Sequence, residues 1–437
     1  MDRKNFLVIN APAMGHLIPL LEFAHRITEH HDVTVTISKS FVPKLTDRNI
    51  LKYQSNPHFH LLPIDDGLPD DVAKVSNTPG LERILIAMEL IRPAVETLLR
   101  EMPVRNGEAL QNAELTRIGA TKMPAVDAVI FDHFLVGFVP EAGHQRGVPC
   151  FEFVPSSEIR NRSQKTHTER PDEKSAIGKW LALKQRAEPF LFGRIVNNFR
   201  ESVPPREDNL PTFYVGPLFP LETVQKEFTP AEQKVQTFLD DHPQRSVIYF
   251  AFGTVVRAAP AQIAEIHHAL TALQRPYIWS LAEPLHQYLP ADRQPDGGGH
   301  LILPWVPQKL ILQHPSVAVF ITHAGWNSAV EGLTCGVPMV SWPGFADQHA
   351  NAAWQASIGV GVTVPETKLG PDARVVPANE IQEWINKAAG WDSTHGVSPF
   401  ADKCAQWKEI IGKVWTTGGS SLNDFNAFLC HVNKLAT

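Results

Sequence analysis

The feature that most constrains this chain is a strand-turn-helix pattern that occurs at its start and again after its midpoint. Phe6 to Ile9 is a short apolar run typical of a buried parallel strand, and a turn from Ala11 to Gly15 follows it. Apolar residues then recur at helical spacing from Leu17 to Ala24. Val33 to Ile37 alternates like a second strand, so the chain is predicted to begin with a β-α-β unit.

Further apolar runs in both halves predict the strands of two parallel sheets. In the first half these runs are Val126 to Phe131 and Val148 to Val154. In the second half a helix is expected at Pro260 to Leu273, since proline is well tolerated in a first helical turn. The strands expected around this helix are Ser246 to Phe252, Tyr277 to Leu281, Leu301 to Leu303, Val317 to Thr322 and Pro338 to Trp342. We therefore predict an α/β fold with two Rossmann-like domains that face a central cleft.

A Pro-rich stretch from Leu210 to Pro220, followed by a polar segment, separates the two patterns. The chain has 437 residues, which is too long for one ordinary core, so two large domains are the simplest division. We expect an N-terminal domain over residues 1–218, a linker over 219–243 and a second domain over 244–415.

Composition and charge argue against several classes of protein. Lys and Arg total 40 against 46 Asp and Glu, with no long run of either sign, so nucleic acid is not the expected partner. The four cysteines are widely spaced and form no ligand cluster, which predicts a reduced compartment without structural zinc. No run of about 18 apolar residues occurs, and the first apolar run is shorter than a signal-peptide core. We expect a cytoplasmic protein with no membrane partner, and the sequence is compatible with a monomer.

The glycine clusters argue against a nicotinamide-dependent dehydrogenase. Gly297 to Gly299 follows no predicted strand, and Gly359 to Gly361 opens no predicted helix. A dinucleotide-binding loop needs both neighbours, because its glycines connect a strand to the helix whose start holds the pyrophosphate.

One predicted helix start in the second half has the composition of an anion-binding site. The strand Val317 to Thr322 runs directly into His323-Ala-Gly-Trp-Asn-Ser328, and helical spacing continues to Gly336. Backbone N–H groups and the helix dipole attract anions at such a start, and Gly325 lets an anion approach closely. The alternative is that Asn and Ser only cap the helix.

Carboxylates follow at positions suited to sugar hydroxyls. Glu331 lies one turn beyond Asn327, and Asp347-Gln348 begins another predicted helix after a Pro-Gly turn. A diphosphate at the helix start, with these groups nearby for ribose and sugar hydroxyls, would form a coherent nucleotide-sugar site.

The window from Trp305 to Gln348 resembles the plant-type donor-binding signature of the UDP-glycosyltransferases of glycosyltransferase family 1. The matching segments are Trp305-Val-Pro-Gln308, His323-Ala-Gly-Trp-Asn-Ser328, Glu331, Gly336-Val-Pro338 and Phe345-Ala-Asp-Gln348. Shorter matches extend the resemblance over most of the chain: Gly15-His16, Val215 to Leu218, Phe252 to Thr254 and Gly418 to Ser421. Ala324 is a departure, because plant members usually have Cys there, so a plant origin is not implied.

The resemblance implies a GT-B fold in which the first domain binds the acceptor and the second binds the UDP-sugar. It also implies that a C-terminal helix over residues 416–437 packs back on the N-terminal domain. The implied donor-binding residues are Thr254, Trp305, Val306, Gln308, His323, Gly325, Trp326, Asn327, Ser328, Glu331, Asp347 and Gln348.

Individual roles also come from the resemblance. Trp305 would stack on uracil, Gln308 would contact the uridine, and Glu331 would hold the ribose hydroxyls. His323, Asn327 and Ser328, with Thr254, would bind the phosphates. Trp326, Asp347 and Gln348 would face the sugar, and a terminal Gln is associated in the family with glucose donors. UDP-glucose is thus the expected co-substrate, with no other cofactor and no metal.

Transfer also needs a base for the acceptor hydroxyl, and His16 is the candidate. It follows the first strand in a turn before a helix, where a side chain can reach a ligand. Asp132 ends a predicted strand and could fix the tautomer of His16, whereas Asp127 should lie at the opposite end of that strand. The pair resembles the catalytic dyad of the family, and one in-line displacement with this base would invert the anomeric centre.

The acceptor is expected to be a small hydrophobic or phenolic molecule with a hydroxyl group, bound by the N-terminal domain. An apolar wall is predicted from Met14, Leu85, Met88, Phe134 and Phe153, although apolar residues at helical spacing more often belong to a core than to a ligand site. Two alternatives remain: a catalytically silent UDP-sugar-binding protein, and a UDP-sugar epimerase or lipid-linked sugar transferase of the same fold. The presence of both His16 and Asp132 argues against the silent protein.

Overall fold

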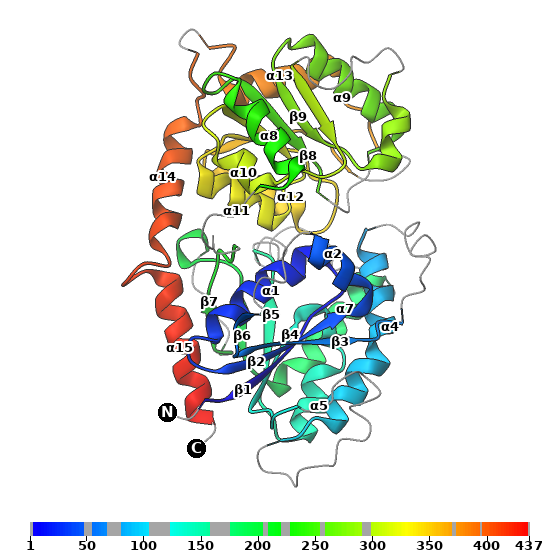
Figure 1. Ribbon diagram of the computed structural model, residues 1–437, viewed down its shortest axis with the longest axis vertical. Coiled ribbons are helices and arrows are strands. Elements are labelled where there is room, and N and C mark those ends of the chain that lie inside the picture. The colour runs from blue at the N-terminus through cyan, green and yellow to red at the C-terminus, as the bar shows by residue number, and fades with distance from the viewer. Residues whose placement is uncertain are drawn as a thin grey trace. The chain divides into compact units, whose positions relative to one another are not determined.

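The computed structural model describes two compact units, each built on a parallel sheet. The residues it describes are 3–47, 55–67, 80–104, 123–157, 175–203, 209–219, 228–253, 258–290, 299–368, 373–393 and 396–435. The first unit contains the described residues up to 219 together with those from 414 onward, and the second contains those from 228 to 413 (Figure 1).

The first unit has a seven-stranded sheet in the order β3-β2-β1-β4-β5-β6-β7, with parallel pairing throughout. The strands are β1 (Asn5–Ile9), β2 (Asp32–Ser38), β3 (Phe59–Ile64), β4 (Ala128–Asp132), β5 (Cys150–Val154), β6 (Leu191–Val196) and β7 (Thr212–Tyr214). The described α-helices are α1 (Met14–Ile27), α2 (Val42–Asp47), α4 (Gly80–Glu101), α5 (Val139–Gln145), α7 (Ala176–Ala187) and α15 (Ser420–Leu435).

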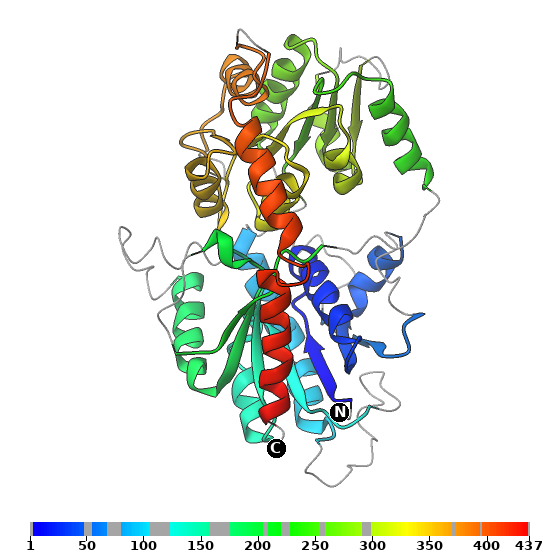
Figure 2. The same cartoon turned by 90° about the vertical axis from the view of Figure 1, so that its left-hand side faces the viewer.

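Helices cover both faces of this sheet, because successive strand residues point to opposite sides. Phe6 and Val8 of β1 belong to a core with α1 and α15, and Phe428 of α15 lies 6.1 Å from Phe6 between ring centroids. Leu7 and Ile9 belong to the other core, with α4 and α5. Figure 2 shows α15 as the red helix beside the strands of this unit. The last helix of the chain therefore completes the first core.

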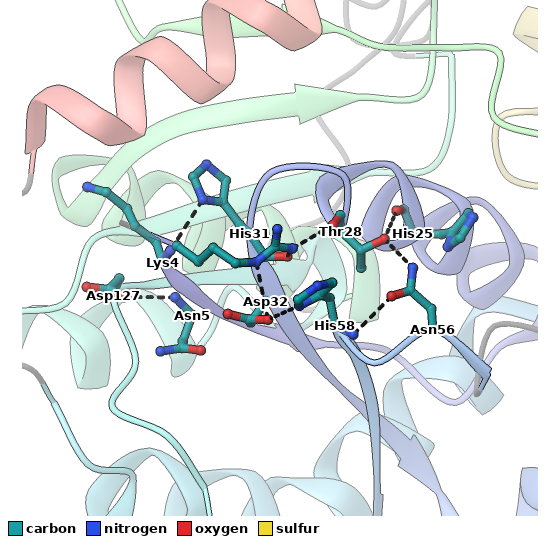
Figure 3. A network of polar contacts seen from close by, with 10 residues as sticks. Lys4, Asn5, His25, Thr28, His31, Asp32, Asn56, His58 and Asp127 are labelled. Carbon is teal, nitrogen blue, oxygen red and sulfur yellow. Dashed lines mark hydrogen bonds and ion pairs between the residues drawn. The ribbon is translucent and has the colours of Figure 1, made fainter. Parts of the chain in front are cut away.

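The amino end of the sheet carries its own polar network, shown in Figure 3. Asp127 Oδ2 accepts a hydrogen bond from the Asn5 N–H at 2.8 Å, and His58 Nδ1 lies 2.7 Å from Asp32 Oδ1. Asp132 ends β4 at the other end of the sheet. Asp127 and Asp132 thus lie at opposite ends of the strand, as expected.

The second unit has a six-stranded parallel sheet in the order β10-β9-β8-β11-β12-β13. The strands are β8 (Val247–Ala251), β9 (Tyr277–Ser280), β10 (His300–Leu303), β11 (Val317–Thr322), β12 (Met339–Ser341) and β13 (Gly361–Thr363). The described α-helices are α8 (Pro230–Asp240), α9 (Pro260–Ala272), α10 (Gln308–Gln313), α11 (Trp326–Cys335), α12 (Gln348–Ser357), α13 (Ala378–Ala389) and α14 (Ala401–Lys413). Ile248 and Phe250 face a core formed with α9 and α13.

Some elements differ from the prediction. Four strands, β3, β6, β7 and β13, were not predicted, and helix α8 lies within the expected linker. Thr229 and Glu232 form a capping box at the start of α8, in which each side chain accepts a hydrogen bond from the backbone of the other. Among the described helices, none is long and apolar enough to cross a membrane. The cytoplasmic location stays a prediction.

Candidate active site

In the first unit, two neighbouring parallel strands bring His16 and Asp132 together. Strand β1 ends at Ile9, and a short turn leads into α1, whose first turn carries His16. Strand β4 pairs with β1 and ends at Asp132. His16 Nδ1 lies 2.8 Å from Asp132 Oδ2, although 116 residues separate them.

Asp132 is fully buried, and its surroundings favour the carboxylate. Burial by itself raises the pKa of Asp132, but the His16 ring, His133 and the Phe134 N–H together outweigh it and hold this pKa below its usual value. A carboxylate only accepts hydrogen bonds, so Nδ1 of His16 is the donor. In the neutral imidazole, Nε2 is then left with a lone pair.

Aromatic rings pack around this pair. Phe134 is stacked on His16 with ring centroids 5.0 Å apart, and His133 lies 5.4 Å from His16. Trp180 of α7 contacts both residues, at 5.5 Å from Phe134 and 5.4 Å from His133. Burial lowers the pKa of His133 to about 3, so its imidazole is neutral. Sequence reasoning missed His133, although its position next to Asp132 was a usable signal.

The positions of the five residues predicted to form the acceptor wall support that prediction only in part. Phe134 lies against His16, while Met14 and Leu85 are half-buried. Phe153 is fully buried and packs on Phe23, with ring centroids 5.9 Å apart, and Met88 of α4 is buried in the core on the other side of the sheet. Assigning Phe153 and Met88 to the wall was therefore wrong, because their side chains are used in the cores.

In the second unit, the predicted anion site lies at the start of α11. Gly325 is the N-cap, and it has no side chain with which to cap the helix. The alternative in which Asn327 and Ser328 act only as caps is thus wrong, since both lie inside the first turn. Ala324, just before the cap, has a left-handed backbone with φ of 59°. The start of a ten-residue helix is therefore available for an anion.

The imidazole of His323 lies between two glycines. A Cβ on Gly325 would collide with His323 Nε2, and a Cβ on Gly253 would lie 2.7 Å from His323 Cε1. Burial lowers the pKa of His323 to about 4, and the Ala251 backbone offsets only part of this effect. His323 is thus a neutral hydrogen-bond donor here rather than a cation.

A polar network joins the segments that the resemblance assigns to uridine. Gln308 donates to Ser328 Oγ at 3.1 Å and to Glu331, and its Oε1 accepts from Tyr249 at 2.9 Å. Burial raises the pKa of Glu331, and the Gln308 hydrogen bond opposes this shift. Trp305 keeps 40% of its surface exposed. Tyr249, which lies outside the signature, was not predicted.

Val306, next to Trp305, is buried. Thr254 lies outside the described residues.

The segment assigned to the sugar is held by its own backbone and by α12. Gln348 Oε1 accepts from the N–H groups of Gly344 and Phe345 at 2.9 and 3.1 Å, so Nε2 is its remaining polar atom. Asn351 Nδ2 donates to Asp347 Oδ2 and to the Ala324 carbonyl, both at 3.0 Å. Asn351 thus ties this segment to the start of α11, and sequence reasoning missed it.

Trp326 behaves differently from the expectation that it faces the sugar. Its indole is buried and lies 5.4 Å from Trp354 of α12 between ring centroids. The ring of Trp326 therefore contributes to packing between α11 and α12.

The chain has two Rossmann-like units. One holds a His–Asp pair, and the other holds a helix start without a side-chain cap beside groups that can accept hydrogen bonds from hydroxyls. These features define a nucleotide-sugar glycosyltransferase of the GT-B class. Comparisons with known proteins agree. Residues 217–381 match the family model described as UDP-glucoronosyl and UDP-glucosyl transferase. Over these residues the chain matches the UDP-glycosyltransferase family, and it is similar to plant enzymes of that name along most of its length.

Some relatives match along most of the chain, and others match about half of it. UDP-glycosyltransferase 73E1 of Stevia rebaudiana is 26% identical, over 88% of this chain and 87% of its own length. Cinnamate beta-D-glucosyltransferase of Fragaria ananassa is 31% identical, over 51% of this chain and 41% of its own length. UGT71G1 of Medicago truncatula, crystallised with UDP-glucose, matches with a TM-score of 0.75 at 23% identity, over 100% of this chain and 99% of its own. The last match establishes the fold.

Proposed function

We propose that this enzyme transfers glucose from UDP-glucose to a hydroxyl of a small hydrophobic or phenolic acceptor, with inversion of configuration. The observation that carries the proposal is the 2.8 Å contact between His16 Nδ1 and Asp132 Oδ2. A protein that only binds UDP-sugars needs no such pair, whereas transfer to a hydroxyl needs a base.

The proposed chemistry is a single displacement. Nε2 of His16 takes the proton from the acceptor hydroxyl as the oxygen attacks the anomeric carbon. The bond from that carbon to the UDP oxygen breaks, and UDP leaves with the electron pair. Asp132 stabilises the imidazolium that forms, because its carboxylate accepts from Nδ1. Attack opposite the leaving group converts an α-linked donor into a β-linked product.

The proposed donor site lies in the second unit. In this proposal the partly exposed Trp305 stacks on uracil, and Glu331 accepts hydrogen bonds from the ribose hydroxyls. The diphosphate would lie at the start of α11, where backbone N–H groups, Asn327, Ser328 and neutral His323 offer hydrogen bonds.

A preference for glucose rests on Gln348 and Asp347. With Oε1 of Gln348 already bonded to backbone N–H groups, its Nε2 can donate to a sugar hydroxyl while Asp347 accepts from another. The names of relatives support glucose and phenolic acceptors, since they include a cinnamate glucosyltransferase and an anthocyanidin 3-O-glucoside 5-O-glucosyltransferase. One structural neighbour, UGT89C1 of Arabidopsis thaliana, was crystallised with UDP-L-rhamnose and with quercetin.

A donor-by-acceptor screen tests the proposal. UDP release is measured for UDP-glucose, UDP-galactose, UDP-glucuronate and UDP-N-acetylglucosamine, each with a panel of phenolic and terpenoid alcohols. We expect the fastest turnover with UDP-glucose and a phenol. Faster turnover with glucuronate would contradict the role of Gln348. Tight UDP binding without release in any combination would favour the silent binding protein.

A further inference from the structure

The His16–Asp132 pair has a third potential ligand beside it. One ring nitrogen of each of His16 and His133 and a carboxylate oxygen of Asp132 lie within 4.8 Å of one another. Among the described residues, no hydrogen bond involves the His133 ring. Phe134 and Trp180 pack against that ring and hold it in place.

We propose that His16, Asp132 and His133 bind a transition-metal ion such as Zn²⁺, and that the bound ion inhibits glycosyl transfer. Two imidazoles and one carboxylate are a donor set that zinc favours, with a fourth position left for water. Asp132 is a carboxylate and His133 is neutral, and these are the forms in which the two groups bind a metal. Mg²⁺ and Ca²⁺ prefer oxygen ligands and should bind weakly here.

The distances need only small side-chain movements. Tetrahedral zinc, with bonds of about 2.0–2.2 Å, holds its ligand atoms about 3.4 Å apart. The 2.8 Å distance between His16 Nδ1 and Asp132 Oδ2 would lengthen slightly. The distance from the His133 ring nitrogen to the other two ligand atoms, at most 4.8 Å, would shorten. Asp132 Oδ1 can keep its hydrogen bond from the Phe134 N–H during this change. His16 is the partly exposed member, with 19% of its side chain accessible, so an ion can enter from its side.

Inhibition follows from the two tautomers of His16. Without metal, Nδ1 carries the proton and Nε2 has the lone pair that acts as the base. A metal ion on Nδ1 takes that position, so the single proton of the neutral ring must move to Nε2 through solvent. Nε2 can then no longer accept a proton from the acceptor. The inhibition rests on the proposed role of His16 as the base, whereas binding of the ion does not.

Metal binding is tested directly with Co²⁺, whose visible absorption reports tetrahedral coordination by nitrogen and oxygen. The full-length protein is compared with His133→Phe, which keeps an aromatic ring beside Phe134, and with His133→Asn in case Phe does not fit. His144→Phe is the control, since His144 is an exposed histidine of the same unit. We expect a tetrahedral spectrum in the wild type and in His144→Phe, and its loss in both His133 variants and in His16→Ala.

Inhibition is tested by titrating Zn²⁺ into the UDP-release assay. We expect reversal by EDTA, no effect of Mg²⁺, and a half-inhibitory zinc concentration at least about tenfold higher in His133→Phe than in wild type. Equal zinc sensitivity and equal Co²⁺ spectra in wild type and His133→Phe would overturn the proposal, because the ion would then bind elsewhere. If Co²⁺ binding depends on His133 but no donor and acceptor pair gives turnover, the metal site stands and the proposed function fails.

Discussion

Arg194 Nε donates a hydrogen bond to Glu152 Oε2 at 2.6 Å, and the two residues are direct partners across strands β5 and β6. Both are buried, and Lys184 of α7 lies 2.6 Å from the other oxygen of Glu152. This charged group ties α7, which carries Trp180, to the sheet that carries Asp132.

Removing the charge of Glu152 should strongly destabilise the first unit. Glu152→Gln leaves the buried Arg194 without its counter-charge, which costs about 3–5 kcal/mol in free energy of unfolding. Urea unfolding followed by circular dichroism measures the loss. Glu96→Gln is the control, because its ion pair with Arg92 is exposed and should contribute about 1 kcal/mol or less. Equal losses in both variants would contradict the prediction.

The contribution of Glu152 should also depend on pH. Burial raises the pKa of Glu152, but Lys184 and Arg194 outweigh this effect and lower it from 4.5 to about 2. A lowered folded pKa means that the stabilisation is fully present above about pH 4.5 and is lost as pH falls toward 2. Unfolding curves at several pH values should therefore show the difference between wild type and Glu152→Gln shrinking below pH 4.5. A difference that stays constant over that range would argue against the ion pairs as its cause.

Variants of the His–Asp pair separate catalysis from donor binding. His16→Ala and Asp132→Asn should each lower kcat by about 10²–10⁴, because the base or its orientation is lost. The dissociation constant for UDP, measured by calorimetry, should stay near that of wild type. Asp127→Asn is the matched control, since Asp127 bonds the Asn5 backbone at the other end of β4. Turnover at the wild-type rate in His16→Ala would refute the proposed base.

Glu331 can be tested with a ligand that lacks the hydroxyls it is proposed to bind. Glu331→Gln should weaken UDP binding by about tenfold to a hundredfold, the range expected for hydrogen bonds to a charged group. The same substitution should change affinity little for 2′,3′-dideoxy-UDP. Glu383→Gln, on an exposed position of α13, should affect neither ligand. Equal losses for both ligands would show that Glu331 acts on the fold rather than on ribose.

The glycine at the start of α11 gives a steric test. Gly325→Ala places a methyl group against the His323 ring, and overpacking of about 1–3 kcal/mol should weaken UDP binding by at least about fivefold. Gly412→Ala is the control, because a Cβ there meets open space within a helix. It should leave UDP affinity unchanged and slightly raise stability. Unchanged UDP affinity in Gly325→Ala would show that His323 can move without cost.

Strands and helices could be predicted from the sequence where a continuous pattern of apolar residues marks the element. Strands such as β1 and β11 are continuous apolar runs, and these were predicted. Strand β3 contains the exposed His60 and also Pro63, which break its pattern, and β13 is only three residues long. Helix α8 was taken as linker because only its buried stripe, which includes Val235, is apolar.

The same limit applies to the candidate site. The segments from Trp305 to Gln348 form a compact motif, so their proximity could be predicted. Asn351 and Tyr249 look like ordinary helix and strand residues, and only the folded chain reveals their contacts with the motif. Phe153 was misassigned because an apolar strand residue can face a core or a ligand, and sequence does not tell which.

Helix α15 completes the first core from the far end of the chain, and this affects the order in which the protein can fold. All described residues of the second unit precede residue 414, so α15 is synthesised after every described element of that unit. The first unit must wait with its Phe6 and Phe23 face uncovered until Phe428 arrives. A premature stop codon before α15 would thus keep all described elements of the second unit and expose an aromatic surface of the first unit that is prone to aggregation or chaperone capture.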